Sequence, residues 1–182
     1  MGSSGPEEFN RWRAAHSEAL QLAERLCSSA RVFRRYAGEL KYFPQAERQP
    51  EVGGDLREAA TSLRNGVTAA MALAARWDQE LMWLRSVDPD SPADALQREH
   101  ARAREAITLL RAALDLFQRA VGEPERASLD APYGAGAPRR VHPGAQCTWV
   151  AERAENLFRE LSNLALRKEN LLLAVERAPL KP

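Results

Sequence analysis

Apolar side chains recur every three or four residues along most of this chain, and that spacing constrains its fold more than any other feature. In one stretch, Leu96, Ala103, Ile107, Leu110 and Leu114 all fall on one stripe of a helix. A strand would instead alternate apolar and polar residues. Four such stretches predict amphipathic helices over about residues 6–42, 55–87, 92–121 and 148–177. We therefore expect an all-α fold.

Proline, glycine and aspartate separate the predicted helices. The segment Asp88–Pro92 is so short that the helices on either side of it should pack antiparallel as a helical hairpin. Residues 44–54 are expected to form a loop, and residues 122–147 a longer one, because they contain four prolines and four glycines. The sequence thus predicts a single domain over residues 1–182, an antiparallel bundle of four long helices with a Pro/Gly-rich loop before the last.

Composition excludes several classes of partner. The 26 basic and 25 acidic residues nearly cancel, so we expect no direct binding to nucleic acid and no attraction to a membrane surface. No apolar run approaches the length of a membrane span, and residues 1–5 lack the features of a secretion signal. The two cysteines, Cys27 and Cys147, are too few for a disulfide framework and favour the nucleus or cytosol.

No residue set predicts an enzyme or a metal protein. The three histidines, His16, His100 and His142, lie far apart, and none has a second ligand at helical metal-site spacing. His142 and Cys147 are close in sequence, but no orienting group accompanies them. We predict neither catalytic residues, nor a metal site, nor a cofactor.

Two features stand out from the helical background. The tryptophans Trp12, Trp77, Trp83 and Trp149 are numerous for such a chain and suit either a core or a protein interface. Lys168 falls on the apolar stripe of the last helix. The sequence leaves open whether that helix end leaves the core, whether the ammonium pairs with an acid, or whether it meets a partner helix.

The C-terminal third carries an ordered series of landmarks. They are Leu129-Asp130, Tyr133-Gly134, Arg140, Thr148-Trp149, Leu161, Arg167-Lys168-Glu169 and Leu171-Leu172-Leu173. Their order and spacing over roughly Leu129 to Val175 resemble the family of the cyclin-dependent kinase 2-interacting protein. Elsewhere only an aromatic-bearing helix around Trp12 is comparable. The two clearly separated middle helices and the Ala/Gly-rich loop depart from that family.

The resemblance implies a nuclear adaptor linked to replication-origin kinases and checkpoint signalling. It also implies association with a AAA+ ATPase assembly that acts in DNA replication and in maturation of the large ribosomal subunit, where a small helical subunit pairs with the adaptor. The matching positions are the candidate partner-binding residues. They are Tyr133, Gly134, Arg140, Trp149, Arg167, Lys168, Glu169 and Leu172.

Our hypothesis is therefore a non-enzymatic helical adaptor that docks other proteins through an exposed helical seam and the Pro/Gly-rich loop. Two alternatives remain. One is a structural coiled-coil subunit of an unrelated assembly. The other is a helical bundle that binds a small molecule between its helices, for which only His16 and Lys168 offer inward polar groups.

Overall fold

The computed structural model describes residues 4–42, 50–87, 93–122 and 143–177. Its helices are α1 (Ser4–Tyr42), α2 (Pro50–Ala74), α3 (Trp77–Val87), α4 (Ala93–Gly122) and α6 (Pro143–Arg177). Apart from Ala75 and Arg76, every described residue is helical, which confirms the expected all-α bundle. None of the described helices has a stretch apolar and long enough to cross a membrane.

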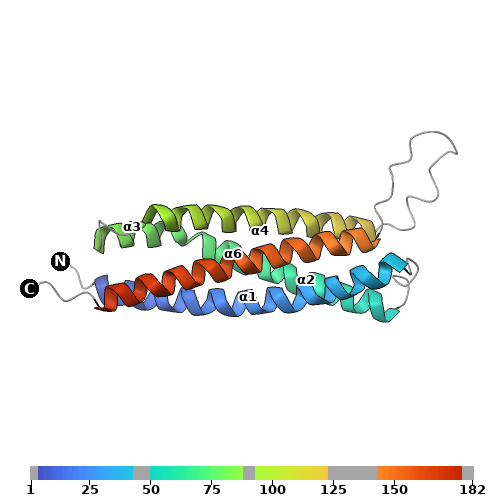
Figure 1. Ribbon diagram of the computed structural model, residues 1–182, viewed down its shortest axis with the longest axis horizontal. Coiled ribbons are helices and arrows are strands. Elements are labelled where there is room, and N and C mark those ends of the chain that lie inside the picture. The colour runs from blue at the N-terminus through green and yellow to red at the C-terminus, as the bar shows by residue number, and fades with distance from the viewer. Residues whose placement is uncertain (1–3, 43–49, 88–92, 123–142, 178–182) are drawn as a thin grey trace, which may run out of the picture.

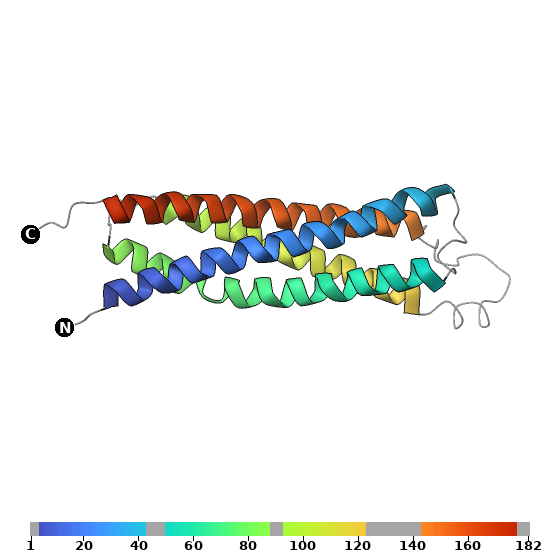
Figure 2. The ribbon, with the colours of Figure 1, turned by 90° about the horizontal axis from the view of Figure 1, so that it is seen from below.

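The helices form four antiparallel rods (Figures 1 and 2). α1 packs against α2 and α6, and α4 packs against α6, α2 and α3. α3 continues the direction of α2, so the two together make one of the four rods. Successive rods run up and down, and the start of α1 therefore lies at the same end of the bundle as the end of α6.

The contact between α1 and α6 is the most extensive of any helix pair. Both helices carry buried alanines along their length, and a methyl side chain lets two backbones approach closely. The buried alanines are Ala15, Ala19, Ala23, Ala30 and Ala37 on α1 and Ala151, Ala154 and Ala165 on α6.

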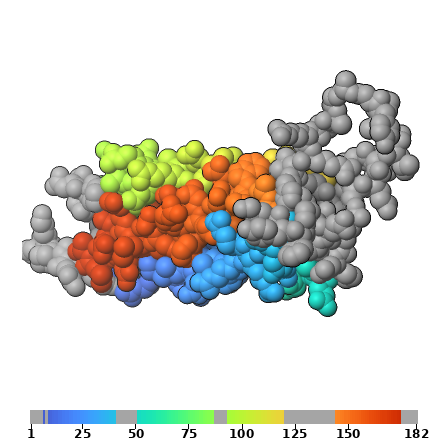
Figure 3. Space-filling view, turned by 45° about the vertical axis from the view of Figure 1, so that its right-hand side comes forward, coloured from blue at the N-terminus to red at the C-terminus, as the bar shows by residue number. Residues whose placement is uncertain are grey.

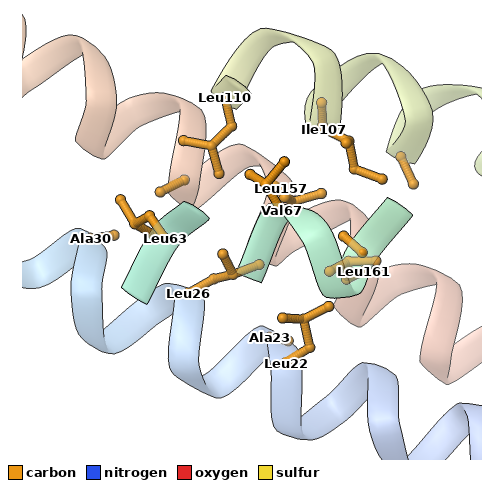
Figure 4. Close-up of a cluster of buried hydrophobic side chains, with 14 of the residues drawn as sticks. Leu22, Ala23, Leu26, Ala30, Leu63, Val67, Ile107, Leu110, Leu157 and Leu161 are labelled. Carbon is orange, nitrogen blue, oxygen red and sulfur yellow. The ribbon is translucent and has the colours of Figure 1, made fainter. Parts of the chain in front are cut away.

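All four rods meet in the middle of the bundle around large aliphatic side chains (Figure 4). Leu26 of α1, Leu63 of α2, Leu110 of α4 and Leu157 of α6 are each at most 1% exposed. The apolar stripes read from the sequence are therefore covered by one another rather than left open. This burial of apolar surface is the main force that holds the rods together.

Three predicted boundaries are wrong. The helix expected over 55–87 is divided at Ala75–Arg76 into α2 and α3. It also begins earlier, at Pro50, because proline suits the first position of a helix and because Val52 is buried. The last helix likewise begins at Pro143 rather than near Thr148, so residues 143–147 of the expected loop are helical. Residues 123–142 of that loop lie outside the described residues.

Candidate functional site: a buried polar cluster at the α3 end

The site is built around Lys168, whose side chain points into the bundle between α1, α3, α4 and α6. The residue is only 4% exposed, and its ammonium pairs with the carboxylate of Glu80 on α3. Of the three possibilities that the sequence left open, pairing with an acid is the one found. The Nζ atom also lies 6.0 Å from the ring centroid of Trp12 and 5.8 Å from that of Trp77. Indole faces attract a cation at this range, so two tryptophans support the ion pair.

Burial of the ammonium has an electrostatic cost. It lowers the pKa of Lys168 from its ordinary value, an effect that the Glu80 carboxylate opposes and that Arg76 reinforces. A buried ion pair of this kind seldom stabilises a protein more than well-packed apolar residues would. Replacing both partners with apolar residues should therefore change stability little, whereas removing one partner would leave a buried charge unpaired.

His100 of α4 is the second buried ionisable group. It is fully buried, and its ring stacks on Trp77 with 4.7 Å between centroids and 10° between planes. Burial, together with the positive charges of Lys168 and Arg104, lowers the pKa of His100 to about 3. The imidazole is consequently neutral at physiological pH.

Arg104 joins this cluster to the break between α2 and α3. Its Nη2 donates to the carbonyl oxygen of Ala74 at 3.1 Å and to Oδ1 of Asp78 at 3.1 Å, and its guanidinium lies 5.6 Å from the Trp77 ring centroid. In an unbroken helix the Ala74 carbonyl would accept from the amide four residues later. Arg104 thus satisfies a backbone acceptor at the end of α2.

Several buried polar atoms around α3 have no hydrogen-bond partner among the described residues. They are Nδ1 and Nε2 of His100 and Nε1 of Trp12. Trp12 is itself 2% exposed and meets Trp83 of α3 edge to face at 5.2 Å. Buried groups of this kind are normally hydrogen-bonded, and no protein side chain or backbone group within the described ranges supplies the bond here.

The two charged groups at the centre of the cluster are engaged with each other. Glu80 and Lys168 engage each other, and their side chains are 11% and 5% exposed. The hollow beside them, between α1 and α3, has a volume of about 170 Å³, below the usual size of a small-molecule site. A larger hollow of about 530 Å³ lies between α1 and α2 over Gly66. Across the described ranges, no three His, Cys, Asp or Glu side chains are grouped as metal ligands.

The candidate partner-binding residues lie in different surroundings. Leu172 and Lys168 are buried, and Trp149 is half-buried and packs against the core. Glu169 is exposed, and Arg167 pairs through Nε with Oε1 of Glu99 at 2.5 Å. Three of the candidates, Tyr133, Gly134 and Arg140, lie outside the described residues.

The prediction that only His16 and Lys168 offer inward polar groups is wrong, because His100 is fully buried. Neither this burial nor the roles of Glu80 and Arg104 were predicted. A signal existed for two of these three residues. His100 lies between Leu96 and Ala103 in three-four steps, and Glu80 follows Trp77 by three residues, so both belong to apolar stripes. A charged or imidazole side chain on such a stripe marks a buried polar group in the same way that Lys168 does.

The fold and site together define a four-rod, up-and-down helical bundle with a buried polar cluster at one end. Comparison of the chain with protein-family models, with curated proteins and with solved structures found no match.

Proposed function

We propose that this protein is a non-enzymatic helical adaptor that binds other proteins through the outer face of α6. The proposal is supported first by two exposed leucines on that helix. Leu166 is 60% exposed and Leu173 is 39% exposed. They lie seven residues apart, within the segment that resembles the cyclin-dependent kinase 2-interacting protein family.

The outer face of α6 has the pattern of a helix-binding surface. Asn163, Leu166, Asn170 and Leu173 follow one another in steps of three, four and three, and all four are exposed. This spacing is that of the contact positions of a coiled coil, in which a second helix covers the leucines. Figure 3 shows the surface of α6 open along the bundle, between α1 and α4.

The inner face of α6 is covered within the bundle and is not available to a partner protein. Leu157, Leu161 and Leu164 are at most 2% exposed and are covered by the other helices. A partner therefore meets a helix that is already held in place, which lowers the entropic cost of binding. Glu169, exposed beside the leucines, offers a charge to a basic partner side chain.

By the same resemblance, we propose that the partners are a second helical subunit and an ATPase or kinase complex in the nucleus, acting in DNA replication, checkpoint signalling and large-ribosomal-subunit maturation. The test is affinity purification of the tagged full chain from a nuclear extract, with quantitative mass spectrometry. A variant carrying Leu166→Glu and Leu173→Glu should lose a helical subunit and its ATPase or kinase.

The matched control carries Leu20→Glu and Leu116→Glu. These leucines are 43% and 46% exposed, but they belong to α1 and α4. The control should keep the same partners. Equal recovery from the α6 variant and the wild-type chain would refute the proposal, and so would recovery of no nuclear complex at all.

A thermal-shift screen of the purified chain against nucleotides, metal ions and common metabolites separates the adaptor from the small-molecule alternative. A ligand that binds the native state raises its apparent stability. We expect no shift with any of these compounds. A shift that depends on Lys168 or His100 would favour a ligand site in the polar cluster.

A further inference from the structure

The α3 helix is the element least integrated into the bundle. It has eleven residues, and its main backbone neighbours are α4 and the adjacent α2. It reaches α1 and α6 through side chains, with Trp83 against Trp12 and Glu80 against Lys168. We expect a short helix held by a few large side chains to open at a lower free energy than the rods around it.

The chain is already interrupted where α3 begins. No glycine or proline lies between Val67 and Val87, yet the helix turns at Ala75–Arg76. There the amide of Arg76 donates to Leu73 rather than to a residue four positions back. Since no local sequence feature imposes the break, we attribute it to tertiary contacts, in which Arg104 binds the freed Ala74 carbonyl and Trp77 stacks on His100. A break of this kind can serve as a hinge.

α3 packs onto a surface of the bundle that we call its seat. Three other helices contribute one polar group each to this surface. Lys168 of α6 needs a carboxylate, because a buried ammonium without one is strongly unfavourable. Trp12 of α1 and His100 of α4 keep nitrogens that α3 does not satisfy. The seat is therefore complementary to an acidic, aromatic helix, and α3 meets this requirement with Glu80 against Lys168 and Trp77 against His100.

We propose that α3 is an exchangeable occupant of this seat, and that the seat receives an amphipathic helix of a partner protein with an aromatic residue followed three residues later by a carboxylate. Trp77 and Glu80 of α3 display this spacing. In the complex, the incoming aromatic ring stacks on His100 and the incoming carboxylate pairs with Lys168. The inference rests on the proposed adaptor function and adds to it the chemistry of the partner.

The experiment uses a fluorescent peptide of residues 75–87 as the incoming helix, and its Glu80→Gln version as the matched control. Both are titrated into the purified full chain up to millimolar concentrations, because the tethered α3 competes at an effective concentration of about that size. We expect the wild-type peptide to bind at least tenfold more tightly than the Glu80→Gln peptide. A Lys168→Met chain should bind the two peptides equally.

A second host, the full chain with Glu80→Gln, has a weakened α3 of its own and should bind the wild-type peptide more tightly than the wild-type chain does. Circular dichroism establishes whether each host is folded, and the wild-type host decides the question if a variant is not. Absence of binding to the folded hosts, or equal binding of the two peptides to the wild-type chain, would overturn the inference. Because only purified components are used, the result is independent of whether a nuclear partner is recovered.

Discussion

In the middle of the bundle the four rods meet through leucine, valine, isoleucine and alanine (Figure 4), whereas at the α3 end tryptophan, histidine and an ion pair lie among buried leucines such as Leu84 and Leu96. Both regions are buried, but their binding forces differ. Aliphatic burial is non-directional and tolerates small shifts. The polar end has a defined geometry, because Glu80, Lys168 and His100 are favourable only with their neighbours in place. Aliphatic burial therefore supplies most of the stability, and the polar groups of the α3 end fix how α1, α3, α4 and α6 fit together.

The largest expected effect comes from removing one partner of the buried ion pair and leaving the other in place. Lys168→Ala leaves the Glu80 carboxylate buried without its partner and should lower the free energy of unfolding by about 4 kcal/mol. Denaturant unfolding of the purified chain measures the change. The double variant Glu80→Leu with Lys168→Met should recover most of the loss, because it removes both charges. Failure to recover would mean that the ion pair itself is a major source of stability.

The matching experiment in the middle of the bundle is Leu157→Ala. This side chain is fully buried, and its truncation should cost about 3 kcal/mol through lost apolar burial and the cavity left behind. The same denaturant series measures it. Leu166→Ala, at an exposed position on the same helix, is the control and should change stability little. A small effect of Leu157→Ala would remove the distinction between the two regions.

Acidification from pH 7 to pH 5 should lower the free energy of unfolding through His100. The pKa of His100 is lowered to about 3 in the folded chain, against about 6.5 in the unfolded chain. Between these two pH values the imidazole is protonated in the unfolded chain and neutral in the folded chain. Stability is then lost as pH falls, by about 2 kcal/mol between pH 7 and pH 5.

The control for this pH dependence is His100→Phe, which keeps an aromatic ring against Trp77 but cannot bind a proton. Its stability should be nearly flat between pH 7 and pH 5, measured by denaturant unfolding at each pH. An unchanged slope in this variant would show that other groups titrate, and that His100 does not sense the buried charges as described.

The smallest expected effect concerns the helix break. Arg104→Ala removes the donor to the Ala74 carbonyl and should cost about 1 kcal/mol. Arg111→Ala, at an exposed position further along α4, is the control and should be nearly neutral. An equal effect of the two substitutions would mean that the break needs no support from α4.

The sequence predicted the aliphatic middle of the bundle better than it predicted the polar α3 end. Spacing alone identified the aliphatic stripes, because residues such as Leu110 and Leu157 repeat with the helical period. It also identified Lys168 as anomalous. It did not reveal that Lys168 pairs with Glu80, since the two lie 88 positions apart and meet only through the packing of α3 on the bundle.

The break at Ala75–Arg76 was unpredictable for a related reason. Local residues favour a continuous helix there, and tertiary contacts of Trp77 and Arg104 override that preference. The early starts at Pro50 and Pro143 were readable in principle, because proline is favourable at a first helical position. Glycines nearby, such as Gly53 and Gly144, led to their interpretation as loops.

Native-state hydrogen exchange of the wild-type chain, resolved by segment, tests the distinction between the two regions most directly. The amides of α3, residues 77–87, should open at a free energy at least about 2 kcal/mol below that of α4 residues 103–117 in the aliphatic middle. Exchange of both segments at one common free energy would contradict a bundle whose polar end opens separately.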